Sequence, residues 1–214
     1  MGVGFRAGTA TLIRERRGHR GRRVVAGTPV VAIVCSAGGL VALQQVLGGL
    51  DPALGAAVVV LQHLDPRSHS QLARLLGEHS RLPVSQARDG AALARGRAVV
   101  APAGWHTLVA DGPSVALIRS GALPPARPSA DLLLTSLALT VGASAVAVVL
   151  TGGGHDGATG TSAVKRFGGC VLVSDEVTSM NFGMPGAAID RETVDQMLPL
   201  QRIAATLNDL FTDS

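Results

Sequence analysis

Apolar and polar positions along the chain follow two periodicities, which together predict strands that alternate with helices. Uninterrupted apolar runs occur at 30–34, 56–61 and 145–150, as is typical of central parallel strands buried on both faces. Between the first two runs, leucines and valines over 40–47 recur at the spacing of one helix face. This alternation predicts an α/β fold with a doubly wound, mostly parallel β-sheet flanked by helices in three layers.

Shorter patterns complete the predicted domain. Apolar segments at 107–110 and 115–118, separated by Asp111-Gly112-Pro113, predict a small antiparallel hairpin. Ser129 is a suitable N-cap for the helix that follows it. Because the pattern contains no repeat and no interdomain linker, we expect one domain over 29–214. Further helices are predicted over 68–78, 131–141, 158–167 and 200–210, and further strands over 84–87, 98–101 and 170–174.

Composition and charge divide the chain into two parts. Hydrophobic residues make up 47% of the 214 residues but aromatics only 2%, so the core must consist of Ala, Val and Leu. The first 24 residues hold seven Arg against Glu15, whereas the rest of the chain has 12 basic and 14 acidic residues. We therefore expect residues 1–28 to be an Arg-rich, disordered extension, and the domain to bind no specific nucleic acid.

The sequence also bears on location and cofactors. It contains neither the apolar region of a secretory signal nor an uninterrupted apolar stretch long enough to span a membrane. Cys35 and Cys170 are expected to be reduced core residues, and no His, Cys and Asp cluster has zinc-ligand spacing. We therefore expect a cytoplasmic protein that uses no metal or cofactor and does not insert into a membrane.

Three polar side chains follow predicted buried strands, namely Ser36, His63 and Asp156. In an open α/β sheet the carboxyl ends of neighbouring strands converge on one crevice, so these residues can meet although they are far apart in the chain. Their order, Ser then His then Asp, favours a serine hydrolase, in which a base activates the hydroxyl and a carboxylate orients the base.

Each of these segments has a second interpretation. The glycine turn after Ser36 is also typical of a phosphate-binding turn or a helix cap. A single histidine at a strand end, such as His63, is commonly a hydrogen-bonded structural residue. The glycine-rich loop around Asp156 also suits a metal or a phosphate, since such turns present backbone N–H groups. The residues alone leave these alternatives open.

Six segments follow one another along the chain, namely Ala-Ile-Val-Cys-Ser-Ala-Gly-Gly, Gln-His-Leu, Val-Ala-Pro-Ala-Gly-Trp-His, Arg-Pro-Ser-Ala-Asp, Leu-Thr-Gly-Gly-Gly-His-Asp-Gly and Phe-Gly-Met-Pro. Together, in this order, they resemble the catalytic domain of CheB-type protein-glutamate methylesterases, over about residues 30–210. The resemblance implies an enzyme of chemotaxis that hydrolyses glutamate γ-methyl esters on methyl-accepting chemoreceptors, releases methanol, and can also deamidate specific glutamines.

The resemblance also implies roles for individual residues. By motif, Ser36 is the nucleophile, His63 the general base and Asp156 its orienting partner. The backbone N–H groups of Ala37 and Gly153 occupy the positions of the oxyanion hole. Where the family usually has Thr and Met, this chain has these two smaller residues, but the three triad positions are intact.

The resemblance also implies roles for other positions in the matching segments. Arg127, Ser129 and Met184 are expected to line the substrate cleft. His155 replaces the family's usual Asn before the aspartate. His106 and the Trp before it are expected to be surface-exposed and to take no part in the chemistry.

The segment before the first predicted strand bears on how the enzyme is regulated. Such methylesterases commonly carry an N-terminal receiver domain, whereas only about 29 residues precede the first predicted strand. We therefore expect an enzyme that is constitutive or is governed by a separate regulatory protein, with chemoreceptor cytoplasmic domains as partners. The alternatives are a noncatalytic receptor-binding module of the same fold, which the substitutions at Ala37 and Gly153 motivate, and an esterase for a different substrate.

Overall fold

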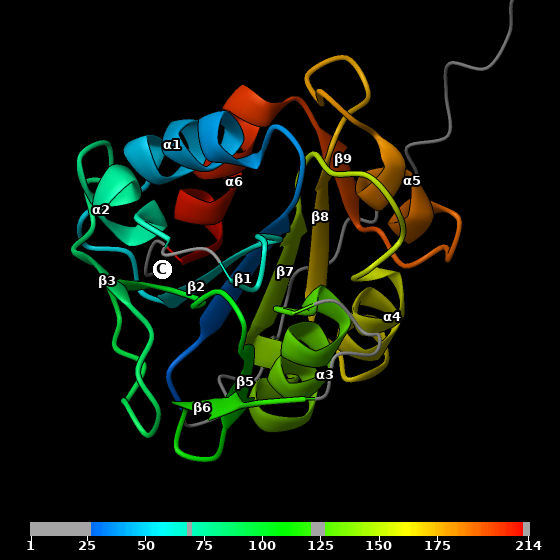
Figure 1. Ribbon diagram of the computed structural model, residues 1–214. Helices are drawn as coiled ribbons and strands as arrows, with labels where there is room; N and C mark the ends of the chain where they lie inside the picture. The colour runs from blue at the N-terminus through cyan, green and yellow to red at the C-terminus, as the bar shows by residue number, and fades with distance from the viewer. Residues whose placement is uncertain (1–26, 68–69, 121–126, 212–214) are drawn as a thin grey trace, which may run out of the picture.

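The computed structural model describes residues 27–67, 70–120 and 127–211. Most of the predicted extension over 1–28 therefore lies outside the described residues. Within them, strands and helices alternate as the hydrophobic pattern predicts, and the chain forms a sheet covered on both faces (Figure 1).

The main sheet has seven strands in the order β3-β4-β2-β1-β7-β8-β9, and every neighbouring pair in it is parallel. Its two central strands, β1 and β7, are apolar throughout and entirely buried, as strands covered on both faces must be. The strands are β1 (Val30–Cys35), β2 (Ala57–Gln62), β3 (Val84–Gln86), β4 (Ala98–Val100), β7 (Ala145–Val149), β8 (Cys170–Ser174) and β9 (Gln196–Leu198).

Helices cover the two faces of this sheet as separate layers (Figure 1). One hydrophobic cluster joins one sheet face to α1, α2 and α6, and a second cluster joins the other face to α3, α4 and α5. The predicted three-layer α/β/α fold is therefore confirmed. The helices are α1 (Gly39–Gly49), α2 (Leu72–Gly77), α3 (Ala130–Val141), α4 (Ala158–Arg166), α5 (Gly183–Ile189) and α6 (Leu200–Phe211), with a short 3₁₀ turn at Gly142–Ser144.

The predicted hairpin is also present. Strands β5 (His106–Ala110) and β6 (Ser114–Ile118) pair antiparallel and form a sheet of their own. The hairpin is attached to α3 by two side-chain hydrogen bonds. Ser136 Oγ accepts from Val109 N at 3.0 Å, and Thr140 Oγ1 donates to Val109 O at 2.9 Å.

Two elements were absent from the prediction. Helix α5 contains two glycines and Pro185, which are poor helix formers, but the proline lies in the first turn, where its missing N–H is not needed. Strand β9 has only three residues and pairs with β8 at the edge of the sheet. Both segments obtain their structure from packing on neighbouring elements rather than from a periodic sequence.

Candidate active site

Ser36 directly follows β1, which lies between β2 and β7 in the sheet. Its backbone N–H donates to Thr151 O at 2.9 Å, and the backbone N–H of His63 donates to Cys35 O at 3.0 Å. The parallel register that pairs Cys35 with Gln62 thus continues to Ser36 and His63. Adjacent strands lie about 4.8 Å apart, so the two residues are direct neighbours at the carboxyl edge of the sheet.

The turn after Ser36 leads directly into α1. Gly38, the residue before the helix, has a φ of 77°, which side-chain-bearing residues rarely adopt. With no side chain, it cannot cap α1, and no acidic residue lies in the first turn. The positive end of this helix therefore lies three residues from the Ser36 hydroxyl without a permanent counter-charge.

The loop after β7 approaches Ser36 closely. A Cβ atom at Gly152 would lie 2.8 Å from Ser36 Cβ and 3.0 Å from Ser36 N, so only glycine fits there. Thr151 Oγ1 donates to Ala37 O at 2.9 Å, which joins this loop to the one that carries the serine. Among the described residues, the backbone N–H groups of Ala37 and Gly153 donate to no protein acceptor, as an oxyanion hole requires.

His63 and Asp156 form a short hydrogen bond. His63 Nε2 lies 2.7 Å from Asp156 Oδ2, and the two side chains are 18% and 22% exposed. Because an ionised carboxylate only accepts hydrogen bonds, Nε2 carries the proton and Nδ1 keeps its lone pair. In the most familiar serine triads the carboxylate bonds Nδ1 instead, so this imidazole presents its opposite nitrogen to the proton donor.

The Asp156 carboxylate is held by the start of α3. Its Oδ1 accepts from Ser129 Oγ at 3.1 Å and from Asp131 N at 2.9 Å, and its Oδ2 accepts from Ala130 N at 2.8 Å. Burial by itself raises the pKa of Asp156, but the hydrogen bonds from His63 and from these backbone N–H groups outweigh it and lower the pKa below its usual value. Asp156 is therefore held in its charged form.

A second carboxylate, that of Asp131, connects the start of α3 to the start of α4. Asp131 Oδ1 accepts from Gly157 N at 3.0 Å and from Gly160 N at 2.7 Å, at the start of α4. The two contacts are therefore reciprocal. Asp156, which precedes α4, binds the N-terminus of α3, and Asp131, which lies in the first turn of α3, binds the N-terminus of α4. This function of Asp131 was not predicted from the sequence, although an acidic residue in a first helical turn was a usable signal.

The three residues expected to line the substrate cleft lie at different depths. Ser129 is buried, donates to Asp156, and its Oγ accepts from Leu132 N at 3.4 Å as the N-cap of α3. Met184 is buried too, and its sulfur would lie 2.4 Å from a Cβ atom placed at Gly152. Arg127 is half-buried and donates from Nη1 to Ser120 O at 3.0 Å. Ser129 and Met184 are thus buried residues that contact Asp156 and the Gly152 loop, respectively.

His106 does not lie on the surface. The expectation that it is exposed is wrong, because the side chain is completely buried and its Nε2 lies 2.9 Å from Ser120 Oγ. Burial lowers the pKa of His106, the charge of Arg127 lowers it further, and the charge of Asp156 opposes both. The adjacent Trp105 is partly buried, with the Arg119 guanidinium 4.3 Å from its ring centre.

Cys35 takes no part in this site. Side chains alternate along a strand, and Cys35 packs in the hydrophobic cluster on the α1 side of the sheet. It is a free cysteine, as predicted, and burial raises the pKa of its thiol. A buried thiol of this kind is inert as a nucleophile.

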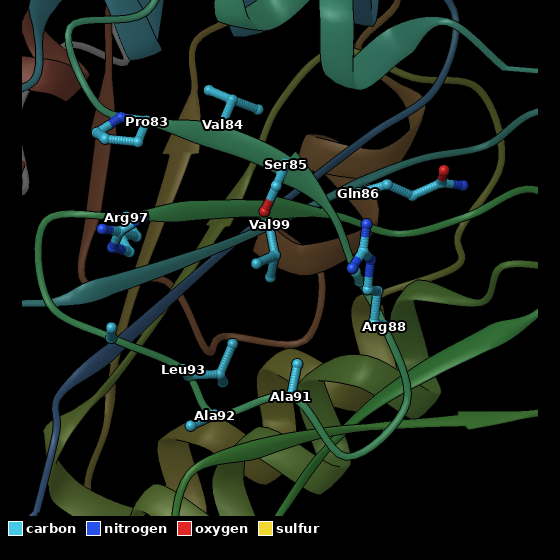
Figure 2. A pocket seen from close by; sticks show the side chains of 12 residues that line it. Pro83, Val84, Ser85, Gln86, Arg88, Ala91, Ala92, Leu93, Arg97 and Val99 are labelled. Atoms are coloured by element: carbon cyan, nitrogen blue, oxygen red, sulfur yellow. The ribbon is translucent and has the colours of Figure 1, made fainter.

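The described part of the chain offers neither a metal site nor a membrane-spanning helix. It contains no group of three or more His, Cys, Asp or Glu able to hold a metal ion, and none of its helices is both long and apolar enough to cross a membrane. A cavity of about 480 Å³ lies between β3, β4 and the loop at 87–97, but no candidate site residue lines it. Figure 2 shows Arg88 and Arg97 toward its opposite ends.

Comparisons with known proteins agree with the geometry. The CheB methylesterase family model matches residues 31–207. Protein-glutamate methylesterase/protein-glutamine glutaminase 2 of Anaeromyxobacter dehalogenans is 40% identical over 207 residues, which are 93% of this chain and 60% of that protein. The protein of the same name from Pseudomonas aeruginosa is 40% identical over 181 residues, which are 83% of this chain and 52% of that protein.

A solved structure shares the fold. The crystal structure of the Thermotoga maritima CheB methylesterase catalytic domain superposes with a TM-score of 0.82 and 33% sequence identity. The match covers 87% of this chain and 100% of that one, whereas the chain covers only 60% and 52% of the two longer relatives.

Proposed function

The chain belongs to the CheB methylesterase family, and from that membership we propose that it hydrolyses glutamate γ-methyl esters on methyl-accepting chemoreceptors and releases methanol. The observation that carries the proposal is the Asp156 carboxylate, held ionised by α3 and hydrogen-bonded to His63 at 2.7 Å beside Ser36. The partner is then the cytoplasmic domain of a receptor, and the protein acts in the cytoplasm.

The first half of the reaction forms an acyl-enzyme. Ser36 Oγ attacks the γ-carbonyl carbon while its proton passes to Nδ1 of His63, the nitrogen that does not face Asp156. The bond to the methoxy oxygen then breaks, and methanol leaves with the proton returned by His63. The glutamyl group stays on Ser36 as an ester.

The second half repeats these proton transfers with water. His63 takes a proton from a water molecule, whose oxygen attacks the acyl carbon, and Ser36 leaves with that proton. The product is a glutamate carboxylate. Glutamine deamidation follows the same two steps with ammonia as the leaving group, in accord with the names of the curated relatives.

The surrounding groups stabilise the charges that arise. Asp156 holds the imidazole in the tautomer with Nδ1 unprotonated and stabilises the imidazolium once it forms. The N–H groups of Ala37 and Gly153, with the open end of α1, stabilise the negative oxygen of the tetrahedral intermediate. A glycine at 153 retains the N–H that this function needs.

The test is methanol release from a methylated receptor cytoplasmic fragment, with the wild-type protein and the Ser36→Ala variant compared. We expect the substitution to lower turnover by a factor of about 10⁴ to 10⁶, since triad members act as a unit. If Ser36→Ala keeps more than about a tenth of the wild-type rate, Ser36 is not the nucleophile. If the wild-type protein releases no methanol but still binds the fragment, the chain is a receptor-binding module.

A further inference from the structure

Two large apolar side chains are exposed to solvent on the loop between β8 and α5. Val177 is 93% exposed and Met180 is 81% exposed. Met180 also packs directly on the turn after the nucleophile, because a Cβ built at Gly38 would lie 2.8 Å from Met180 Cβ and 3.0 Å from its sulfur. We call Val177 and Met180 the apolar ledge.

Hydrogen bonds hold the loop that carries the ledge. On one side of Met180, Asn181 N donates to Thr151 Oγ1 at 2.9 Å. On the other side, Ser179 Oγ lies 2.8 Å from Ser174 Oγ, and Thr178 N donates to Asp175 Oδ1 at 2.9 Å. The backbone on both sides of Met180 is therefore tied to the ends of β7 and β8, and the exposure of the side chain does not come from an unanchored loop.

The position of the ledge determines what it can contact. Gly38 is two residues from Ser36, and two residues span at most about 7 Å. A methyl ester on a protein must bring its carbonyl carbon to Ser36 Oγ, so the side chains that flank the ester on that protein come within reach of Met180. On a helix, residues three and four positions away lie only about 5–6 Å from one another.

From this placement we infer that the apolar ledge is the contact surface for apolar side chains flanking the esterified glutamate of the protein substrate. This inference rests on the proposed function and adds to it a determinant of substrate choice. A single exposed apolar residue is ordinary on a protein surface. The ledge differs because its loop is anchored and because one of its two members, Met180, adjoins the turn after the nucleophile.

The test compares a protein ester with a small ester. The substrates are a methylated receptor cytoplasmic fragment and p-nitrophenyl acetate, whose acyl group has no flanking chain. We expect Met180→Gln, which keeps the length of the side chain but makes it polar, to raise the KM for the fragment about tenfold more than the KM for the small ester. Val177→Thr, which keeps the shape, should act in the same direction with a smaller factor.

Met197 supplies the matched control. It is 55% exposed in edge strand β9 and is not part of the ledge. Met197→Gln should leave the kinetic constants for both substrates at their wild-type values. An equal loss with both substrates in Met180→Gln would overturn the inference, because Met180 would then act on the reaction centre through Gly38.

A binding measurement keeps the inference separate from turnover. In the Ser36→Ala background, calorimetry should show that Met180→Gln weakens binding of the methylated fragment about tenfold. If binding is unchanged, the ledge is not the contact surface even when the protein is a methylesterase. If the wild-type protein cleaves p-nitrophenyl acetate but neither binds nor cleaves the fragment, the proposed function itself fails, and the inference with it.

Discussion

Helices α1 and α3 both begin at the candidate site, but only the N-terminus of α3 is capped and bound to a carboxylate. The start of α1 has neither a capping side chain nor an acidic residue in its first turn. The start of α3 is capped by Ser129 and binds the Asp156 carboxylate through two backbone N–H groups. The same structural feature, the positive end of a helix, thus remains open in one case and is filled permanently in the other.

The difference follows from the charges that the proposed reaction needs. An oxyanion exists only during the reaction, so the groups that stabilise it must be unoccupied beforehand. The carboxylate that orients a histidine must be charged throughout, so it benefits from a permanent partner. Substitutions at the two helix starts should therefore have different consequences.

The largest effect is expected from Asp156→Asn. An asparagine oxygen at the place of Oδ1 can still accept from Asp131 N, but the amide group at the place of Oδ2 then faces His63 and selects the tautomer with a proton on Nδ1. We expect kcat to fall about ten-thousandfold, as for the corresponding change in other triads. Circular dichroism should show that the variant is folded. Retention of more than about a tenth of the activity would mean that Asp156 does not orient the base.

The second prediction concerns Asp131, a positioning residue that acts through Asp156. Asp131→Ala removes two hydrogen bonds to the start of α4 and releases the loop that carries Asp156, so kcat should fall about ten- to hundredfold. Asp131→Asn keeps an acceptor oxygen at that place and should restore most of the rate. If both variants lose the same activity, the charge of Asp131 is what matters and not the hydrogen bonds.

The third prediction concerns a negative charge placed at the uncapped N-terminus of α1. Gly38→Asp and Gly38→Asn introduce nearly the same shape, with the same strain at a φ of 77° and the same contact with Met180. Only the aspartate adds a permanent negative charge at the end of α1. We expect kcat/KM of the aspartate variant to be about five- to tenfold lower than that of the asparagine variant. Equal values would show that the end of α1 does not stabilise the oxyanion.

The smallest effect is expected in the pH dependence of stability. The pKa of Asp156 is lowered in the folded protein, so its charge contributes stability that is fully present above the unfolded pKa of about 3.9. That contribution is lost as the pH falls through the folded value. The Tm difference between wild type and Asp156→Asn should therefore be constant from about pH 7 to pH 5 and shrink below about pH 4. A difference that grows on acidification would contradict the lowered pKa.

Much of the fold was predictable because its central strands are long apolar runs. Strands β1, β2 and β7 were found within one residue of their ends. Helix α5 was missed because its glycines and proline are not typical of a helix. Strand β9 was missed because three residues are too few to show a periodicity. His106 was placed on the surface because burial of a histidine depends on the hairpin packing around it, which its own segment does not reveal.

For the candidate site, the amino-acid sequence was enough to tell which chemical groups stand at the ends of which strands. Ser36, His63 and Asp156 each follow a buried strand, and this could be read from hydrophobic runs and glycine turns. Parallel pairing of these strands then required the three residues to share one edge of the sheet. Local pattern and sheet topology were sufficient for that conclusion.

The orientation of these groups, by contrast, depends on how the helices pack in three dimensions. That Asp156 meets Nε2 of His63 rather than Nδ1, and that Asp131 and Asp156 bind each other's helices, depends on how closely α3 and α4 pack. Gly160 permits this approach, since a Cβ there would lie 2.5 Å from Leu134 Cβ. Hydrogen bonds need their atoms placed to a few tenths of an ångström, and only the packing of elements distant in the chain sets positions that finely.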